Sequence, residues 1–197
     1  RARSAAPRPG PRNPLACRSF LRIVRADNAK ASWKAFSADS EWKEVAKRTT
    51  ANGQIVAKVE SVFLETTDFA RPMDAGNGKG AARVFELRTY TATPKNLPHL
   101  DARFRDHTVK LFGRHGMTNL VYWHLAPGST DEDRKLVYLL AHDSTDAAKK
   151  SFDSFRQDPD WMAARKASEE KAGGSLTEAT DGVLSEFLVP TDYSTWK

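Results

Sequence analysis

Two side chains of one predicted helix, Arg103 and His107, are the first candidates for chemistry in this sequence. Apolar residues recur at helical spacing between residues 95 and 115, and His107 falls on their side, between Phe104 and Leu111. We expect both side chains to face the interior. A histidine over a sheet can act as a general base in a cleft. The role of a packed, hydrogen-bonded core residue is favoured, because no nucleophile or orienting carboxylate is evident nearby.

A second group of candidates alternates along three predicted strands. The group comprises Arg88, Tyr90, Tyr122, His124, Tyr138 and His142. Arg88 and Tyr90 share one face of their strand with Glu86. If these side chains point into an enclosed space, they form a polar and aromatic cleft suited to a small ligand. Structural use at an interface is an equally good interpretation, and alternation alone does not decide which face they occupy.

The sequence predicts neither a metal site nor a cofactor. His99, His107 and His115 recur every eight residues, which on a helix separates neighbours by about 12 Å and rotates them off one face. Cys17 is the only cysteine, so neither an intrachain disulfide nor a thiolate metal site can form. A Ser-His-Asp order, a phosphate-binding loop and a dinucleotide glycine pattern are absent from the sequence. We expect no nucleotide-driven chemistry.

The charge distribution argues against a nucleic-acid partner. The net charge is +6, but seven arginines lie within residues 1–26, where there is no Asp or Glu. Nucleic-acid binding requires Lys and Arg gathered on a folded face beside aromatic residues, and the sequence offers no such pattern. No apolar run approaches the roughly 18 residues of a membrane span. We expect a soluble protein without a transmembrane segment.

Residues 1–17 are predicted to be disordered. They contain four prolines and have neither a helical nor a strand period. An Arg-rich start without acidic residues also fits an organelle transit peptide, although prolines interrupt the amphipathic helix that such a peptide needs. A stray end of a coding region is the favoured interpretation. The compartment stays open among the cytoplasm, export from a bacterium and, in a eukaryote, the mitochondrion.

The chain contains an internal repeat. Residues 18–47 align with residues 137–166 without a gap, and residues 59–69 align with residues 183–193 after a five-residue length difference. The aligned pairs include Trp33 with Phe152, Phe36 with Phe155, Asp39 with Asp158 and Trp42 with Trp161. We therefore expect residues 18–69 to be the C-terminal half of a first copy, residues 70–82 to be a linker, and residues 83–194 to be a complete second copy.

The complete copy has the pattern of a ferredoxin-like α+β fold. We predict strands at 83–91, 117–125, 135–142 and 181–189, a helix at 95–115, and a helical region at 145–171 interrupted at Asp158-Pro159. The resulting order is β-α-β-β-α-β, which places the first strand between the third and the fourth. The half copy lacks its first strand. Its remaining strands therefore need another chain or another segment, or they form nothing stable.

Five segments of the complete copy resemble the NIPSNAP family: FELRTYTATP, ARFRDHTVKLFGRHGM, NLVYWHL, DPDW and TDYS. The resemblance implies a ferredoxin-like unit that pairs its sheet with another to form a dimeric α+β barrel, and some relatives carry two such units. It also implies, for eukaryotic members, an association with mitochondria and with vesicle or organelle quality control. Bacterial members mostly lack a defined activity.

Two functional hypotheses follow. The first is a NIPSNAP-type binding and assembly module without an assigned reaction, most simply a homodimer that binds a protein partner or a small hydrophobic ligand. The alternative is a cofactor-independent enzyme, similar to an oxygenase or isomerase, that acts on a small aromatic or lipid-like molecule in a barrel cleft. This alternative rests on fold-level analogy. A cleft containing His107 and Arg103 would favour the enzyme, whereas a space filled by aromatic side chains would favour the module.

Overall fold

The structure is a computed structural model that describes residues 17–21, 26–70 and 83–194. The predicted disordered segment 1–17, except for Cys17, and the predicted linker 70–82, except for Ala70, lie outside the described residues. The chain divides into two compact units, Arg1–Lys58 and Val59–Lys197.

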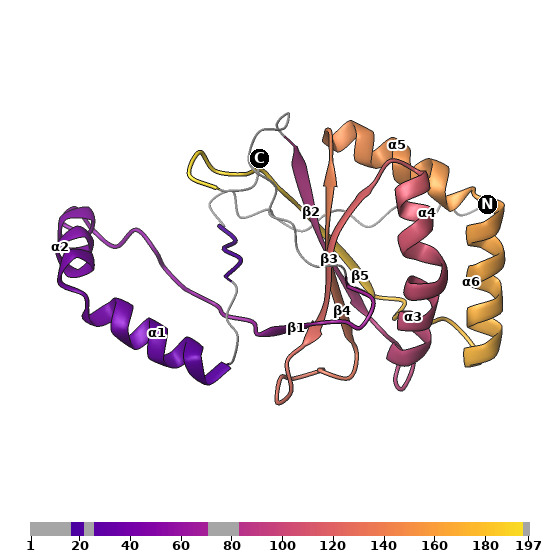
Figure 1. Cartoon of the computed structure of the whole chain (residues 1–197), viewed down its shortest axis with the longest axis horizontal. Helices are drawn as coiled ribbons and strands as arrows, with labels where there is room; N and C mark the ends of the chain where they lie inside the picture. Colours follow the sequence, from indigo (N-terminus) through magenta and orange to yellow (C-terminus); the bar gives the residue numbers. More distant parts are fainter. Residues whose placement is uncertain (1–16, 22–25, 71–82, 195–197) are drawn as a thin grey trace, which may run out of the picture. The chain divides into compact units, whose positions relative to one another are not determined.

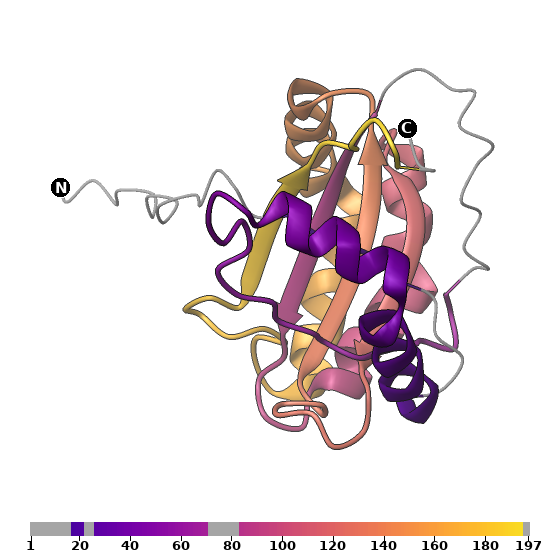
Figure 2. The same cartoon turned by 90° about the vertical axis from the view of Figure 1, so that its left-hand side faces the viewer.

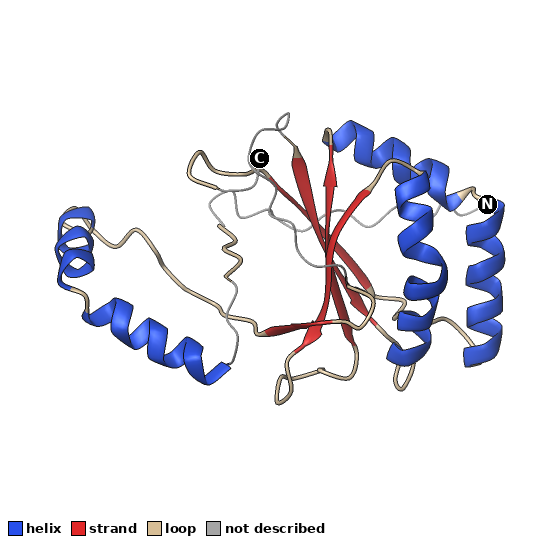
Figure 3. Cartoon of the chain, in the orientation of Figure 1, coloured by secondary structure: helices blue, strands red, loops and turns tan. Residues whose placement is uncertain are grey.

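The second unit contains all the strands of the described residues. In chain order, its elements are β1 (Leu64–Thr66), β2 (Val84–Thr91), α3 (Leu97–Arg103), the π-helical turn η1 (Phe104–Thr108), α4 (Val109–Arg114), β3 (Thr118–Leu125), β4 (Lys135–His142), α5 (Thr145–Arg156), α6 (Pro159–Ala172) and β5 (Val183–Leu188). From β2 onward the order is β-α-β-β-α-β (Figure 3). The predicted α+β class is confirmed.

The five strands form one antiparallel sheet in the order β1-β3-β4-β2-β5. Figure 2 shows β5, β2, β4 and β3 side by side. Strand β2 lies between β4 and β5, so the predicted ferredoxin-like position of the first strand is confirmed. At the other end, β1 pairs with β3 through Leu64 and Leu125. This part of the predicted half copy thus pairs with another segment, over three residues only.

Helices α3 to α6 pack on one face of this sheet (Figure 1). The core beneath them is a cluster in which Phe104 and Phe112 of the helical segment contact Tyr138 of β4. A second apolar cluster lies on the opposite face, and strand residues make up its buried part. These are Phe85, Val121, Trp123, Val137, Leu139 and Ala141. The sheet is therefore apolar on both faces, although the helices of its own unit cover one.

The first long helical segment contains a π turn that the sequence pattern did not predict. The N–H of Val109 donates to the carbonyl of Phe104, five residues earlier, and Thr108 Oγ1 donates to the carbonyl of Arg103 at 3.1 Å. The wider turn rotates the following residues, so that Thr108 is buried and His107 is exposed. The prediction that His107 lies on the apolar side is wrong for this reason. Arg103 is buried, as predicted.

Asp158 starts α6 and ties it to the end of α4. One carboxylate oxygen accepts the backbone N–H of Asp160 at 2.8 Å, which is the predicted N-cap. The other lies 2.7 Å from Nε2 of His115 and 3.2 Å from Nη1 of Arg114. The hydrogen bond from His115, together with those from the α6 backbone and Arg114, lowers the pKa of Asp158 to about 2, although desolvation opposes the change.

The first unit contains helices α1 (Ala26–Ala38) and α2 (Ser40–Thr49), which align in sequence with α5 and α6. Asp39 caps α2 by accepting the backbone N–H of Trp42 at 2.8 Å, as Asp158 caps α6. The strand that follows the helix pair in the complete copy, β5, is not reproduced in full. Residues 59–64 align with β5, but only Leu64 of that stretch lies in a strand.

Exposure of His107 predicts that His107→Ala changes the free energy of unfolding by no more than about 0.5 kcal/mol. Leu111→Ala, which empties a buried position in the same segment, should cost about 2–5 kcal/mol. Urea denaturation of both variants measures the difference. A loss above about 1 kcal/mol in His107→Ala would contradict the π-turn placement.

The pKa of Asp158 predicts a specific acid sensitivity. Its folded pKa of about 2 lies below the roughly 3.9 of an unfolded aspartate, so its charge stabilises the fold above the unfolded value and stops doing so as the pH falls towards 2. Asn keeps the N-cap but carries no charge. The stability gap between wild type and Asp158→Asn should therefore be constant near neutral pH and shrink between about pH 4 and pH 2. Thermal unfolding across that range tests this, and a gap that widens on acidification contradicts it.

Candidate functional site

The six strand residues singled out by sequence all belong to the helix-covered face. Tyr122 and Tyr138 are members of the core beneath the helices. Arg88 pairs with Tyr138 in the β2–β4 register, and residues paired across antiparallel strands share a face. Tyr90 packs against that core, and His124 and His142 share its side of β3 and β4 by alternation. The structure thereby decides the face that the sequence left open.

Four of these residues meet Glu86 in a buried polar cluster, which we define as Glu86, Arg88, Tyr90, Tyr138 and His142. Arg88 donates from Nη1 to Glu86 at 2.5 Å and from Nε to the Tyr138 hydroxyl at 2.9 Å. Its Nη2 lies 3.5 Å from the Tyr90 hydroxyl. Nε2 of His142 lies 2.9 Å from the second oxygen of Glu86. Strands β2 and β4 supply all five side chains.

Two further side chains, Ser185 and Phe152, contact the buried polar cluster. Ser185 of β5 donates to Glu86 at 2.5 Å. The Phe152 ring of α5 lies against the Arg88 guanidinium, 4.3 Å from its centroid to Cζ. A cation against an aromatic face is stabilised by the ring quadrupole when water is excluded. Helix α5 therefore closes the cluster from above, and β5 closes it from the side.

The electrostatics favour an ionised pair at the centre of this cluster. Burial alone raises the pKa of Glu86, but the hydrogen bond from His142 and the charge of Arg88 outweigh it, so the pKa is lowered. Burial likewise lowers the pKa of Arg88, and the neighbouring Tyr138, Tyr90 and Glu86 raise it further than burial lowers it. Burial raises the pKa of Tyr138 well above its usual range. At neutral pH, Glu86 is thus a carboxylate and Tyr138 a neutral hydrogen-bonding phenol.

Aromatic rings fill the space between this cluster and the helices. Tyr122 stacks on Tyr138 with ring centroids 5.1 Å apart and an interplanar angle of 23°. Phe104 lies 5.3 Å from Tyr138 and 5.4 Å from Tyr90. The hydroxyl of Tyr122 donates to the side-chain oxygen of Asn119. The interior beneath the helices is therefore packed with aromatic side chains.

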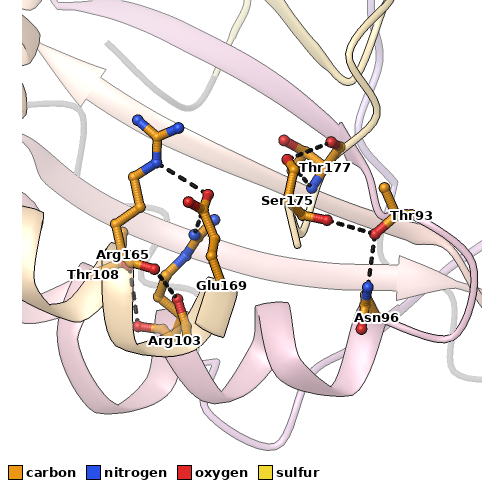
Figure 4. Close-up of polar contacts among 9 residues, drawn as sticks. Thr93, Asn96, Arg103, Thr108, Arg165, Glu169, Ser175 and Thr177 are labelled. Atoms are coloured by element: carbon orange, nitrogen blue, oxygen red, sulfur yellow. Dashed lines mark hydrogen bonds and ion pairs between the residues drawn. The ribbon is translucent and has the colours of Figure 1, made fainter. Parts of the chain in front are cut away.

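Arg103 is separate from the polar cluster and from His107. Its guanidinium lies 5.1 Å from the centroid of the Trp161 ring and 3.7 Å from Oε1 of Glu169. Figure 4 shows Arg103 and Arg165 both reaching towards Glu169, which accepts from Arg165 Nε at 3.0 Å. Nε and Nη1 of Arg103 have no hydrogen-bond partner among the described residues. Burial lowers the pKa of Arg103, as expected for a charge taken out of water.

Beside this arginine, the C-terminal half of α6 borders an open groove of about 580 Å³. The groove is lined by Met162, Arg165, Lys166, Glu169, Glu170, Gly173, Gly174 and Ser175. Two of its side chains are basic and two are acidic. The groove lies at the C-terminal end of α6, where the helix dipole disfavours the binding of anions. Neither Arg103 nor His107 lines it. The groove therefore does not join the two residues predicted for catalysis.

His124 occupies a different environment on β3, where it pairs with Glu65 of the edge strand β1. Its Nε2 lies 3.0 Å from Oδ1 of Asp101 on α3, and this hydrogen bond raises the pKa of His124 against the opposing effect of burial. It borders a second hollow, of about 320 Å³, with Glu65, Thr66, Leu125, Pro127, Glu132 and Asp133. Across the described ranges, no group of three or more His, Cys, Asp or Glu residues is arranged to hold a metal ion.

Sequence reasoning missed several partners of the predicted residues. Asp101, Phe152 and Glu169 contact predicted residues from separate helices, and Ser185 contacts their partner Glu86 across 99 positions of the chain. Only Glu86 carried a usable signal, because its alternation with Arg88 put both on one strand face. Contacts of the other four depend on the tertiary packing.

Comparisons with known proteins place the second unit in a family. Residues 85–195 match the family model described as NIPSNAP. A NIPSNAP family protein of unknown function from Agrobacterium tumefaciens is 16% identical, with a TM-score of 0.46, covering 60% of this chain and 96% of that chain. An uncharacterised NIPSNAP domain protein from Burkholderia xenovorans is 20% identical, with a TM-score of 0.44, covering 56% and 96%. A search of the curated proteins found no match. In the described part of the chain, no helix is long and apolar enough to cross a membrane.

The buried polar cluster predicts a large stability effect at Glu86. Glu86→Gln removes the charge that compensates Arg88 while keeping the shape, and breaking a buried ion pair in this way costs roughly 3–5 kcal/mol. Asp153→Asn is the matched control, because Asp153 pairs with Arg156 on the exposed surface of α5, where the effect should stay below about 1 kcal/mol. Chemical denaturation at pH 7 compares the two. Equal losses would show that the cluster is not a closed ionised network.

Proposed function

Because residues 85–195, which are 111 of the 197 residues, match the NIPSNAP family model, the chain belongs to the NIPSNAP family, and we propose that it is a binding and assembly module that pairs with a second copy of itself. The observation that carries the proposal is the free edge of β5. This strand is at the end of the sheet and pairs with β2 alone among the described strands. We infer that its outer edge pairs with another strand.

The side chains of β5 support a protein partner at this edge. Val183, Leu184 and Phe187 are exposed by 42%, 50% and 42%. The strand sequence, VLSEFL, contains neither the Lys nor the Pro with which soluble proteins often protect a sheet edge, and its one charged residue is Glu186. An edge with three exposed apolar side chains is a template for pairing with another strand. A second β5, running antiparallel about a two-fold axis, is self-complementary and needs no other protein.

The helix-free face of the sheet supports the same assembly. Its apolar cluster includes partly buried Leu188 of β5 and Leu87 of β2, beside the buried strand residues described above. The buried members of this cluster are at most 8% exposed within one chain, so the apolar surface that a dimer could still cover there belongs to partly buried residues such as Leu87 and Leu188 and to exposed Leu184. This arrangement corresponds to the dimeric α+β barrel that the family resemblance implies. The dimer is our proposal.

The placement of the side chains also sets the class of ligand. A space enclosed by the helix-free faces would be bordered by partly buried residues such as Leu64, Leu87 and Leu188, so it would suit a small hydrophobic molecule. The six predicted cleft residues would not border it, because they belong to the helix-covered face. We do not extend the proposal to catalysis, since His107 is exposed and Arg103 lies against Trp161.

Native mass spectrometry of the full chain tests the proposal. We expect a homodimer, and we expect Leu184→Lys to raise its dissociation constant at least about tenfold, because a charge would be brought to an apolar interface. Met162→Lys is the matched control, since Met162 on α6 is exposed to a similar extent, 52% against 50%. A monomeric wild type, or a Leu184→Lys dimer as stable as the control, would overturn the proposal. Extra mass on the dimer would report a bound ligand directly.

A further inference from the structure

The helix pair of the first unit reproduces the aromatic packing of α5 and α6. Phe36 and Trp42 have ring centroids 4.5 Å apart at 33°, while the aligned Phe155 and Trp161 are 4.5 Å apart at 35°. Trp33 lies 5.8 Å from Phe36 at 79°. The aligned Phe152 lies 6.4 Å from Phe155 at 87°. The sequence alignment is therefore accompanied by the same local geometry.

In the second unit, the preceding β-α-β segment covers these rings. Phe112 of α4 lies 5.7 Å from Phe152 and 4.9 Å from Phe155, which are exposed by 8% and 4%. Arg103 of α3 covers Trp161. We call residues 83–136 the front half, because they precede the helix pair and supply its cover. The complete copy thus displays the surface that fits this aromatic pattern.

In the first unit, the equivalent rings are exposed. Trp33, Phe36 and Trp42 are exposed by 48%, 43% and 40%, and α2 has no buried residue. Three adjacent exposed aromatic side chains are uncommon on a surface that has no partner. Their counterparts Phe152 and Phe155 are covered by Phe112 of the front half in the second unit.

The charges at the helix junction complement the same cover. One carboxylate oxygen of Asp158 pairs with Arg114 and His115 of the front half, and the other accepts the backbone N–H that caps α6. Asp39 caps α2 in the same way, and no cation is paired with it among the described residues. A carboxylate at the rim of an exposed aromatic patch therefore matches a basic pair on a docking helix.

We propose that α1 and α2 form a docking surface for the front half of a NIPSNAP-type domain. The partner is a β-α-β segment whose helix carries a phenylalanine at the position of Phe112, an arginine at the position of Arg103, and a basic pair at the positions of Arg114 and His115. This interaction is distinct from the self-pairing at β5, and it uses a different surface of the chain.

A chain with an added copy of residues 83–136 ahead of residue 18 tests this directly. If the added front half covers α1 and α2, amide hydrogen exchange of residues 26–49 should slow at least about tenfold relative to the original chain, because local opening then breaks packed contacts. The added copy carrying changes equivalent to Phe112→Ala and Arg103→Ala is the matched control, since the original second unit stays intact. We expect this control to lose the slowing.

The other outcomes decide against the proposal. Unchanged exchange in residues 26–49, or equal slowing with the control copy, would overturn it. If the original chain self-associates and the double change Phe36→Ala and Trp42→Ala abolishes that association, the surface binds a second copy and the front half is not its partner. Leu184→Lys should leave the slowing unchanged, so a failure of the β5 dimer is distinguishable from a failure of this interaction.

Discussion

The sheet of the second unit is apolar on both of its faces, while the helices of that unit cover one. Leu139 and Leu140, adjacent on β4, are both fully buried although they point to opposite sides. A strand of this kind needs a packed layer above and below it. Helices α3 to α6 supply the first layer. These helices do not cover the opposite face, and the assembly proposal concerns the residues on that face that stay partly exposed, such as Leu87 and Leu188.

The same constraint explains why polar residues that resemble an active site hold the fold together. Arg88 and Glu86 are placed under α5 by the alternation of β2, so their charges must be compensated where water is excluded. His142, Tyr138 and Ser185 supply that compensation from the two neighbouring strands. The network therefore joins β5, β2 and β4 in one register. Its perturbed pKa values follow from burial and pairing, without a substrate.

The two units illustrate how one sequence pattern can have two energetic outcomes. Asp39 and Asp158 cap their helices alike, and the ring pairs that follow have matching geometry. Local structure is thus encoded within each helix pair. Burial is not, because it depends on a front half that adjoins α5 and α6 in the chain. The corresponding rings of the first unit are exposed, and we propose that the front half of another domain covers them.

The sequence by itself determined what depends on short-range spacing. Alternation located the first strand and runs of β-forming residues located the other three, all to within about two residues. The Asp158-Pro159 pair located a helix start, and the element order led to the sheet order. Tertiary structure alone decided the rest. A π turn at residues 104–108 moved His107 outward, which helical periodicity cannot foresee. Alternation also defines two strand faces without saying which one the helices cover, so only packing could place Arg88, Tyr138 and His142 beneath them.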